Sequence, residues 1–286
     1  MTLTKDAETQ ESTVTVRPLQ PTIGAEISGV DLQQPISNAE RDAIKAAILQ
    51  YKVVFFRDQY INREQHVAFA EAFGPLYTHP STSRPDEDNL PQVHRISAVE
   101  AKDLYKDLGR PLEWDPYHSD TSWRLDPTWG AVLRAVDLPE VGGDTIWVDA
   151  GLVYDSLPED VRQRFEGLYV VHDFRDSLNR GGSNYPIVSH PIIRTHRETG
   201  KNILWVNFTL HPWIIGLDRD ASDELLRIVH DAYRKPEHQV RFSWRPGSIA
   251  FWDNRATLHY AVRNYGDYPR LLERILIADE PAFADV

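Results

Sequence analysis

Short runs of apolar, β-branched and aromatic residues, separated by turn residues, dominate the sequence after a polar beginning. Runs of about four to eight such residues are typical of β-strands. They do not alternate regularly with helical segments, which argues against a parallel α/β sheet. A barrel or sandwich with flanking helices fits this order better, so the fold class is predicted to be mainly β. The clearest predicted strands are residues 53–56, 129–136, 145–148, 168–171, 203–206, 240–244, 248–252 and 271–277.

Turn residues between some of these runs predict hairpins. Thr199-Gly200-Lys201-Asn202 separates two β-like runs, as the loop of a hairpin does. Pro246-Gly247 stands between the runs 240–244 and 248–252 and predicts a second hairpin there.

Four helices are predicted where a capping residue precedes apolar residues at helical spacing. The first two begin with capping boxes, because Glu40 and Gln65 follow three residues after the predicted caps. The third is expected to end at Gly167, and the fourth before Pro236. The four predicted helix starts are Ser37, Asn62, Pro158 and Ser222.

The length and composition of the chain indicate one large domain. It has 286 residues, of which 41% are hydrophobic, and this is enough material for a sizeable core. Residues 1–13 are polar and are predicted to be disordered. Residues 14–286 show no repeat or linker and are predicted to form a single domain.

The net charge of −12 makes nucleic acid and anionic membranes poor partners. No run of about 18 apolar residues predicts a membrane-spanning helix. The absence of cysteine excludes disulfides and thiolate metal ligands, and a cytoplasmic location is the simplest expectation. The sequence leaves open whether the protein forms a homo-oligomer, such as a dimer or tetramer.

His118-Ser119-Asp120 is the first pattern with chemical meaning. Alternate side chains of an extended strand share a face, so His118 and Asp120 can reach the same metal ion. His259 follows the strand 248–252 and a polar turn, and it supplies a second imidazole. Two histidines and one carboxylate form a facial triad for iron, although each short motif also fits ordinary surface hydrogen bonding.

Arg270 and Arg274 lie four residues apart near a predicted strand, which places both side chains on one face. Arginine grips carboxylate or sulfonate groups with two hydrogen bonds. The alternative is a pair of solvated surface arginines. A buried Arg274 must meet an anion, either from a substrate or from a protein acid such as Glu273 of a neighbouring chain or Asp279. The other eight histidines outside the triad and position 79 show no metal-like spacing and are expected to be exposed or structural.

The chain resembles the taurine dioxygenase (TauD/TfdA-like) family of iron(II)- and 2-oxoglutarate-dependent oxygenases. The likeness extends from Val14 to Phe283, and its specificity comes from the joint order and spacing of the motifs. These are His118-x-Asp120, Gly142-Gly143-Asp144-Thr145, Trp252-Asp253-Asn254-Arg255-x-x-x-His259, and Arg270 with Arg274, together with the opening stretch Gly24 to Asp31.

The resemblance implies a double-stranded β-helix, also called a cupin-like jelly roll, and a set of site residues. His118, Asp120 and His259 match the catalytic iron ligands. Arg270 matches the arginine that pairs with the distal carboxylate of 2-oxoglutarate, and Thr145 matches a supporting hydroxyl. His79 and Arg274 match positions that hold the sulfonate in taurine-cleaving members.

The resemblance also implies the reaction. Fe(II), O2 and 2-oxoglutarate as co-substrate would hydroxylate a small anionic substrate and release succinate and CO2. A substrate with a sulfonate or sulfate ester at the hydroxylated carbon would then lose sulfite or sulfate. Because Asp120 is present, hydroxylation is favoured over halogenation. Aryloxyalkanoates and natural-product intermediates are alternative substrates, residues 82–115 are expected to set specificity, and a non-catalytic metal-binding barrel is a more distant alternative.

Overall fold

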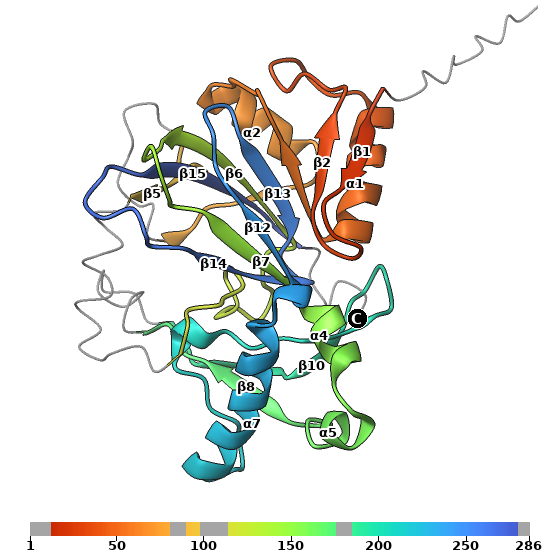
Figure 1. The fold of residues 1–286 in the computed structure, drawn as a ribbon, viewed down its shortest axis with the longest axis vertical. Helices are drawn as coiled ribbons and strands as arrows, with labels where there is room; N and C mark the ends of the chain where they lie inside the picture. Colours follow the sequence, from red (N-terminus) through yellow and green to blue (C-terminus); the bar gives the residue numbers. More distant parts are fainter. Residues whose placement is uncertain (1–12, 81–89, 98–113, 176–184, 280–286) are drawn as a thin grey trace, which may run out of the picture.

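The computed structural model describes residues 13–80, 90–97, 114–175 and 185–279 (Figure 1). Within these ranges an eight-stranded sheet has the order β1-β2-β3-β13-β6-β15-β4, with β5 also paired to β15. A three-stranded sheet has the order β12-β7-β14, and β8–β9 and β10–β11 form two small ribbons. The strands are β1 (Thr15–Pro18), β2 (Ala25–Ser28), β3 (Val53–Phe56), β4 (Leu76–Tyr77), β5 (His94–Ser97), β6 (Gly130–Asp137), β7 (Thr145–Asp149), β8 (Tyr169–His172), β9 (Val188–Pro191), β10 (Ile193–Thr195), β11 (Asn202–Leu204), β12 (Gln239–Phe242), β13 (Ile249–Asp253), β14 (Thr257–Ala261) and β15 (Leu271–Ile277).

Two groups of helices cover opposite sides of the sheets. In the upper part of Figure 1, α1 (Asn38–Tyr51) and α2 (Arg63–Glu71) lie along the large sheet. In the lower part, α4 (Ala150–Ser156), α5 (Glu159–Gln163) and α7 (Arg219–Tyr233) surround the two ribbons. The short 3-10 helices η3 (Phe208–Leu210) and η4 (Pro236–His238) complete the described elements. The mainly β prediction with flanking helices is confirmed.

The side chains of β13 alternate between two hydrophobic cores. On β13, Ile249 and Phe251 pack with the helix-covered face, whereas Ala250 and Trp252 pack between the sheets. Trp147 on β7 belongs to the same inter-sheet core and lies edge-on to Trp252, with ring centroids 5.6 Å apart. Successive strand residues point to opposite faces, so β13 can serve both cores at once.

The first two predicted helices begin where their capping boxes are placed. Ser37 accepts a hydrogen bond from the Glu40 backbone, and the Glu40 side chain bonds back to Ser37. Asn62 and Gln65 make the same reciprocal pair at the start of α2. Such caps satisfy backbone N–H groups that have no partner inside the helix.

Three local predictions are wrong or incomplete. Ser222 does not cap the fourth helix; α7 begins one turn earlier with Asp218 as cap, and the Ser222 hydroxyl accepts from Ile214 N. The third helix is shorter than predicted, because α5 ends at Gln163. The helix α4, capped by Asp149, was not predicted.

The predicted hairpin at Pro246-Gly247 is also wrong. The strand before it, β12, pairs with β7 in the small sheet, and the strand after it, β13, pairs with β3 and β6 in the large sheet. The turn therefore carries the chain from one sheet to the other. The predicted hairpin around Thr199–Asn202 is confirmed, since β10 and β11 pair antiparallel on either side of it.

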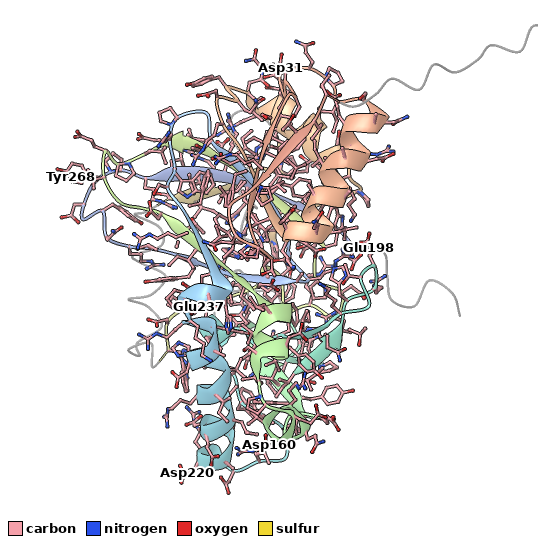
Figure 2. The ribbon with its side chains drawn as sticks, turned by 45° about the vertical axis from the view of Figure 1, so that its right-hand side comes forward. Asp31, Asp160, Glu198, Asp220, Glu237 and Tyr268 are labelled. Atoms are coloured by element: carbon pink, nitrogen blue, oxygen red, sulfur yellow. The ribbon has the colours of Figure 1, made fainter. Side chains whose placement is uncertain are left out.

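The acidic excess of the chain is spread over its surface. Figure 2 shows Asp31 at one end of the molecule, Asp160 and Asp220 at the other, and Glu198 on a third side. Exposed charges at such distances are largely screened at physiological ionic strength, where the Debye length is about 8 Å. The surface charge therefore does not prevent an anion from binding at a local arginine.

The predicted disorder of residues 1–13 lies outside the described residues except at Thr13. Its hydroxyl donates a 2.6 Å hydrogen bond to the Gly29 carbonyl oxygen. Among the described helices, none is both long and apolar enough to cross a membrane.

Candidate functional site

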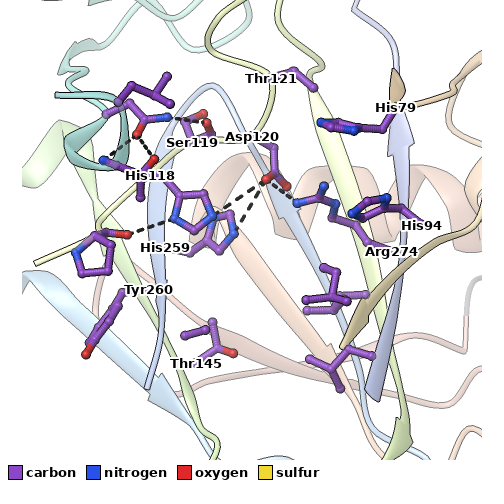
Figure 3. A pocket seen from close by; sticks show the side chains of 18 of the residues that line it. His79, His94, His118, Ser119, Asp120, Thr121, Thr145, His259, Tyr260 and Arg274 are labelled. Atoms are coloured by element: carbon purple, nitrogen blue, oxygen red, sulfur yellow. Dashed lines mark hydrogen bonds and ion pairs between the residues drawn. The ribbon is translucent and has the colours of Figure 1, made fainter. Parts of the chain in front are cut away.

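One cavity of about 300 Å³ opens between the large and small sheets (Figure 3). Strands of both sheets contribute to it: His259 lies on β14 and Thr145 on β7, whereas Arg274 lies on β15. All seven residues predicted from the sequence line this cavity, namely His79, His118, Asp120, Thr145, His259, Arg270 and Arg274.

The two histidines and the aspartate converge on one point. Nε2 of His118 and Nε2 of His259 each lie 4.0 Å from Oδ1 of Asp120. One ligand atom from each of the three residues can be chosen so that all lie within 4.8 Å of one another. Among the described residues this is the single cluster of at least three such side chains.

The backbone brings these residues together by a single bridge rather than a regular strand. His118 N donates to His259 O at 3.0 Å, and His259 N donates to His118 O at 2.7 Å. The chain then turns at Asp120 and continues through Thr121, whose φ is 55°. The side chains of His118 and Asp120 converge as predicted, but they do so from an isolated bridge and a turn rather than from one face of a strand.

The protonation states suit a cation. Burial lowers the pKa of His118, and burial with the neighbouring His118 holds the pKa of His259 well below its usual value. Burial alone would raise the pKa of Asp120, but Arg274 and the two histidines outweigh it, and the net shift is downward. Two neutral imidazoles and an ionised carboxylate are the forms that bind metal.

Hydrogen bonds orient the ligand atoms. His118 Nδ1 lies 3.0 Å from the Pro116 carbonyl oxygen and donates to it, which leaves Nε2 as an acceptor facing the cluster. Only 26% of the His118 side chain is exposed, and the Asp120 side chain is 5% exposed. Oδ2 of Asp120 is buried and has no hydrogen-bond partner among the described residues. A carboxylate oxygen buried in this way needs a cation or donor.

Arg270 and Thr145 lie at another side of the cavity. Arg270 Nε donates to the Gly143 carbonyl oxygen at 3.1 Å, while its Nη2 is buried and unbonded within the described structure. The Thr145 hydroxyl accepts a 3.0 Å hydrogen bond from Trp244 Nε1, so its own proton is free to donate elsewhere.

Glycine is required beside Arg270. Gly143 has a φ of 73°, and a Cβ there would lie 3.0 Å from Arg270 Nε and 3.1 Å from its Cδ. A side chain would be strained by the backbone conformation and would displace the guanidinium. The Gly-Gly pair is thus part of what positions Arg270.

Arg274 lies between the triad and two further histidines, with His94 directly across from it in the β5–β15 pair. One of its Nη atoms bonds Oδ1 of Asp120, and its Nε is buried without a hydrogen bond among the described residues. The rings of His79 and His94 lie 5.0 Å apart. Figure 3 shows His79, His94 and Arg274 grouped on one side of Asp120. These three residues are called the donor cluster below.

Arg274 does meet a protein acid, as one of the two alternatives expected, but that acid is Asp120 and not the suggested Asp279. Asp279 pairs instead with Arg197 at 3.1 Å and lies 3.5 Å from Arg255. Glu273, the residue next to Arg274, faces the opposite side of β15 and pairs with Arg63 and Arg134.

A family comparison identifies the chain. A sequence profile described as "Taurine catabolism dioxygenase TauD, TfdA family" matches residues 15–276. The chain belongs to the TauD/TfdA family.

Relatives in the TauD/TfdA family differ in their named activities. An alkylsulfatase from Acinetobacter baylyi is 31% identical over 284 residues, covering 93% of this chain and 85% of the relative. An (S)-phenoxypropionate/alpha-ketoglutarate-dioxygenase from Sphingobium herbicidovorans is 32% identical over 283 residues, covering 93% and 96%. The crystal structure of a taurine dioxygenase from Burkholderia xenovorans superposes with a TM-score of 0.81 at 36% identity, covering 94% and 92%.

Membership of the TauD/TfdA family makes this protein an oxidoreductase with a cupin-like jelly-roll fold. It is a dioxygenase that depends on Fe(II), 2-oxoglutarate and O2. The cavity fits these cofactors, because it presents two nitrogen donors and one carboxylate, the donor set typical of non-haem Fe(II). It also contains the unbonded Nη2 of Arg270, which suits a carboxylate.

Most other histidines are buried rather than exposed, and several are hydrogen-bonded structural residues as expected. His66, for example, is fully buried and bonds the Val132 carbonyl oxygen. His94 is the residue that sequence reasoning missed, because nothing in its local sequence distinguishes it from these. His211 also lines the cavity, from a left-handed backbone position with φ 47°.

Proposed function

We propose that this TauD/TfdA dioxygenase hydroxylates a small anionic substrate with an apolar tail, either an alkyl sulfate ester or an alkylsulfonate. The observation that carries the proposal is the convergence of a metal-ligand triad and two buried arginines on one cavity. Hydroxylation beside sulfur or ester oxygen would break the C–S or C–O bond and release sulfite or sulfate.

His118, Asp120 and His259 would hold Fe(II), acting as both metal ligands and catalytic residues. Bound iron would supply the activation of O2 that oxidises 2-oxoglutarate, to succinate and CO2, and the prime substrate. The protein keeps the two imidazoles neutral and the carboxylate ionised, and it buries the site against bulk water. The difficult chemistry belongs to the cofactors, and the side chains supply orientation and exclusion of water.

Arg270 and Thr145 would bind the distal carboxylate of 2-oxoglutarate. The unbonded Nη2 of Arg270 is supported by the Nε bond to Gly143, which fixes the plane of the guanidinium. The Thr145 hydroxyl, already accepting from Trp244, is left with a proton to donate. Guanidinium and hydroxyl donors together suit a carboxylate.

The donor cluster of His79, His94 and Arg274 would bind the anionic group of the prime substrate. Burial, and then the Arg274 charge, lower the pKa of His79 to about 4, and the same causes hold the pKa of His94 well below its usual value. The two imidazoles are therefore neutral donors beside one cation. A sulfate or sulfonate group has three terminal oxygens and can accept from all three side chains.

The rest of the cavity favours an apolar tail. Besides Asp120, the carboxylate among its described lining is Asp173, which is already paired with Arg175 at 2.8 Å. A substrate ammonium group such as that of taurine would thus lack a free counter-ion, and burying an unpaired charge is costly. The apolar and aromatic lining residues include Ile96, Leu133, Leu210, Leu272, Trp123 and Phe174.

A second candidate substrate class is an aryloxyalkanoate. The relative named as an (S)-phenoxypropionate/alpha-ketoglutarate-dioxygenase supports it, as does the aromatic group formed by Trp123, Phe174 and Tyr185. A carboxylate has two oxygens, so it would use the donor cluster less fully than a sulfate ester. A metal-binding barrel without activity fits less well, since Arg270 would then bury an unused charge.

We also propose that the enzyme works in the cytoplasm without nucleic-acid or membrane partners. The net charge of −12 and the absence of cysteine support this proposal.

A substrate screen tests the proposed function. With Fe(II), ascorbate and 2-oxoglutarate, a medium-chain alkyl sulfate such as hexyl sulfate is expected to give the fastest succinate release, with equal amounts of sulfate. Hexanesulfonate should react, and taurine and phenoxypropionate should react more slowly. Faster turnover of phenoxypropionate would assign the enzyme to the second class, and no succinate from any anion would refute the proposal.

Loss of a donor-cluster side chain is expected to weaken substrate binding selectively. Arg274→Gln removes a charged donor, and a hydrogen bond to a charged group contributes about 1.5–3 kcal/mol, roughly a 10–100-fold rise in KM. His94→Phe keeps the ring and removes its nitrogens, so a smaller rise is expected.

The KM for 2-oxoglutarate serves as the control for both variants. Because Arg274 also contacts Asp120, Fe(II) affinity is measured in parallel. A substrate KM that stays unchanged in both variants would place the anion elsewhere in the cavity.

A further inference from the structure

The turn that carries Asp120 has little regular secondary structure to hold it. The bridge to His259 ends at His118, and the next residues form a turn that includes the left-handed Thr121. A metal ligand must nevertheless be held to within a few tenths of an ångström for its donor atom to coordinate well. Side chains from elsewhere in the fold must therefore fix this turn.

The Asn254 side chain hydrogen-bonds both the backbone N–H and the backbone carbonyl of Asp120. Its Oδ1 accepts from Asp120 N at 2.8 Å, and its Nδ2 donates to Asp120 O at 2.8 Å and to Thr128 O at 3.0 Å. The Ser119 hydroxyl donates to the Asn254 carbonyl oxygen at 2.6 Å. Asn254 is fully buried, so water does not replace these bonds.

Asn254 is itself held in the turn between β13 and β14, on the way to the third ligand. It follows the last residue of β13, and its backbone N donates to Trp129 O at 2.8 Å. The chain then enters β14, which carries His259. One buried amide thus connects the turn of Asp120 to the connection that positions His259.

We infer that Asn254 is a positioning residue for the metal ligands, an inference that rests on the proposed function. The role requires one acceptor and two donors at the end of a short side chain, and among the natural side chains of this size only asparagine offers them. Aspartate would lack the donors and would turn a second negative charge toward the Asp120 carbonyl. Outer contacts that orient metal ligands typically change affinity or activity by about 10–100-fold.

Gln59 is a control amide with the same hydrogen-bond pattern in a less buried position. Gln59 accepts from Leu32 N at 2.8 Å and donates to Val30 O and Arg57 O, both at 3.2 Å. It makes the same pattern of one accepted and two donated backbone bonds, but it lies outside the residues that line the cavity. Gln59→Ala therefore reports the cost of losing such an amide without touching the ligands.

The experiment measures the Kd for Fe(II) anaerobically, with the full-length protein, in wild type, Asn254→Ala, Asn254→Ser and Gln59→Ala. Thermal unfolding of the metal-free proteins is recorded alongside. Asn254→Ala is expected to raise the Fe(II) Kd about 10–100-fold, and Asn254→Ser to raise it less, since its hydroxyl can accept from Asp120 N. Gln59→Ala is expected to lower the unfolding temperature and leave the Kd unchanged.

A wild-type Kd in the Asn254 variants would overturn the inference, as would an equal rise in Gln59→Ala. If Asn254→Ala does not fold, Asn254→Ser decides by the same criterion. Failure of the proposed function looks different, because wild type itself would then bind Fe(II) no better than His259→Ala.

Discussion

Replacing His259 with alanine is expected to abolish both Fe(II) binding and succinate formation. Two ligands remain, and the loss should exceed the roughly 100-fold that removal of an outer contact can cost. The fold should survive, although the ring leaves a gap near Trp252 and Trp147, whose centroids lie 5.0 and 6.3 Å from it. Anaerobic Fe(II) titration and a succinate assay measure the two effects, and circular dichroism checks the fold.

His66→Ala is the matched control for His259→Ala. His66 is also fully buried, and it bonds a backbone carbonyl, that of Val132 at 3.2 Å, from a position outside the cavity lining. The His66→Ala variant should be less stable than wild type and should still bind Fe(II). Stoichiometric Fe(II) binding with ordinary turnover in His259→Ala would remove His259 from the metal site.

Arg270→Ala is expected to raise the KM for 2-oxoglutarate by roughly 100-fold or more. Leaving one partner of a buried ion pair uncompensated costs about 3–5 kcal/mol, and each 1.4 kcal/mol is a factor of ten. Thr145→Val should have a smaller effect, because it removes a neutral donor. Succinate formation at varied 2-oxoglutarate, with saturating prime substrate, gives the KM values.

Arg241→Ala is the control for Arg270→Ala, because it also removes an arginine close to the segment Gly143–Thr145. Arg241 pairs at 2.6 Å with Asp144, the residue between Gly143 and Thr145. The Arg241 side chain is 53% exposed. Its removal should leave the KM for 2-oxoglutarate unchanged. If Arg270→Ala keeps the wild-type KM, the anchor of the co-substrate lies elsewhere.

Local signals in the sequence predicted most of the elements. Strands 53–56 and 271–277 have the predicted bounds, and the capping boxes at Ser37 and Asn62 are present. These features depend on neighbouring residues alone. The helix α7 shows where local signals fail to place a helix start. Asp218 and Ser222 are both good caps, and only packing decides between them.

Pairing between strands depends on residues far apart in the chain. Pro246-Gly247 forms the expected turn, yet its two flanking strands enter different sheets, and no local pattern distinguishes this from a hairpin. The site depends on strand pairing in the same way. The sequence therefore indicated Arg274, which belongs to a motif, but not His94. His94 becomes a cavity residue only through the register of β5 against β15.

The bridge between His118 and His259 has a consequence for how the enzyme acquires its iron. These residues are far apart in the chain, and contacts between such distant segments are slow to form because a long loop must close. A growing chain at the ribosome therefore has no iron site until the segment beyond His259 has been made and both sheets have closed. Iron can then stabilise only the folded protein, by mass action. Chains shortened before His259 should emerge without iron, however well their first strands form.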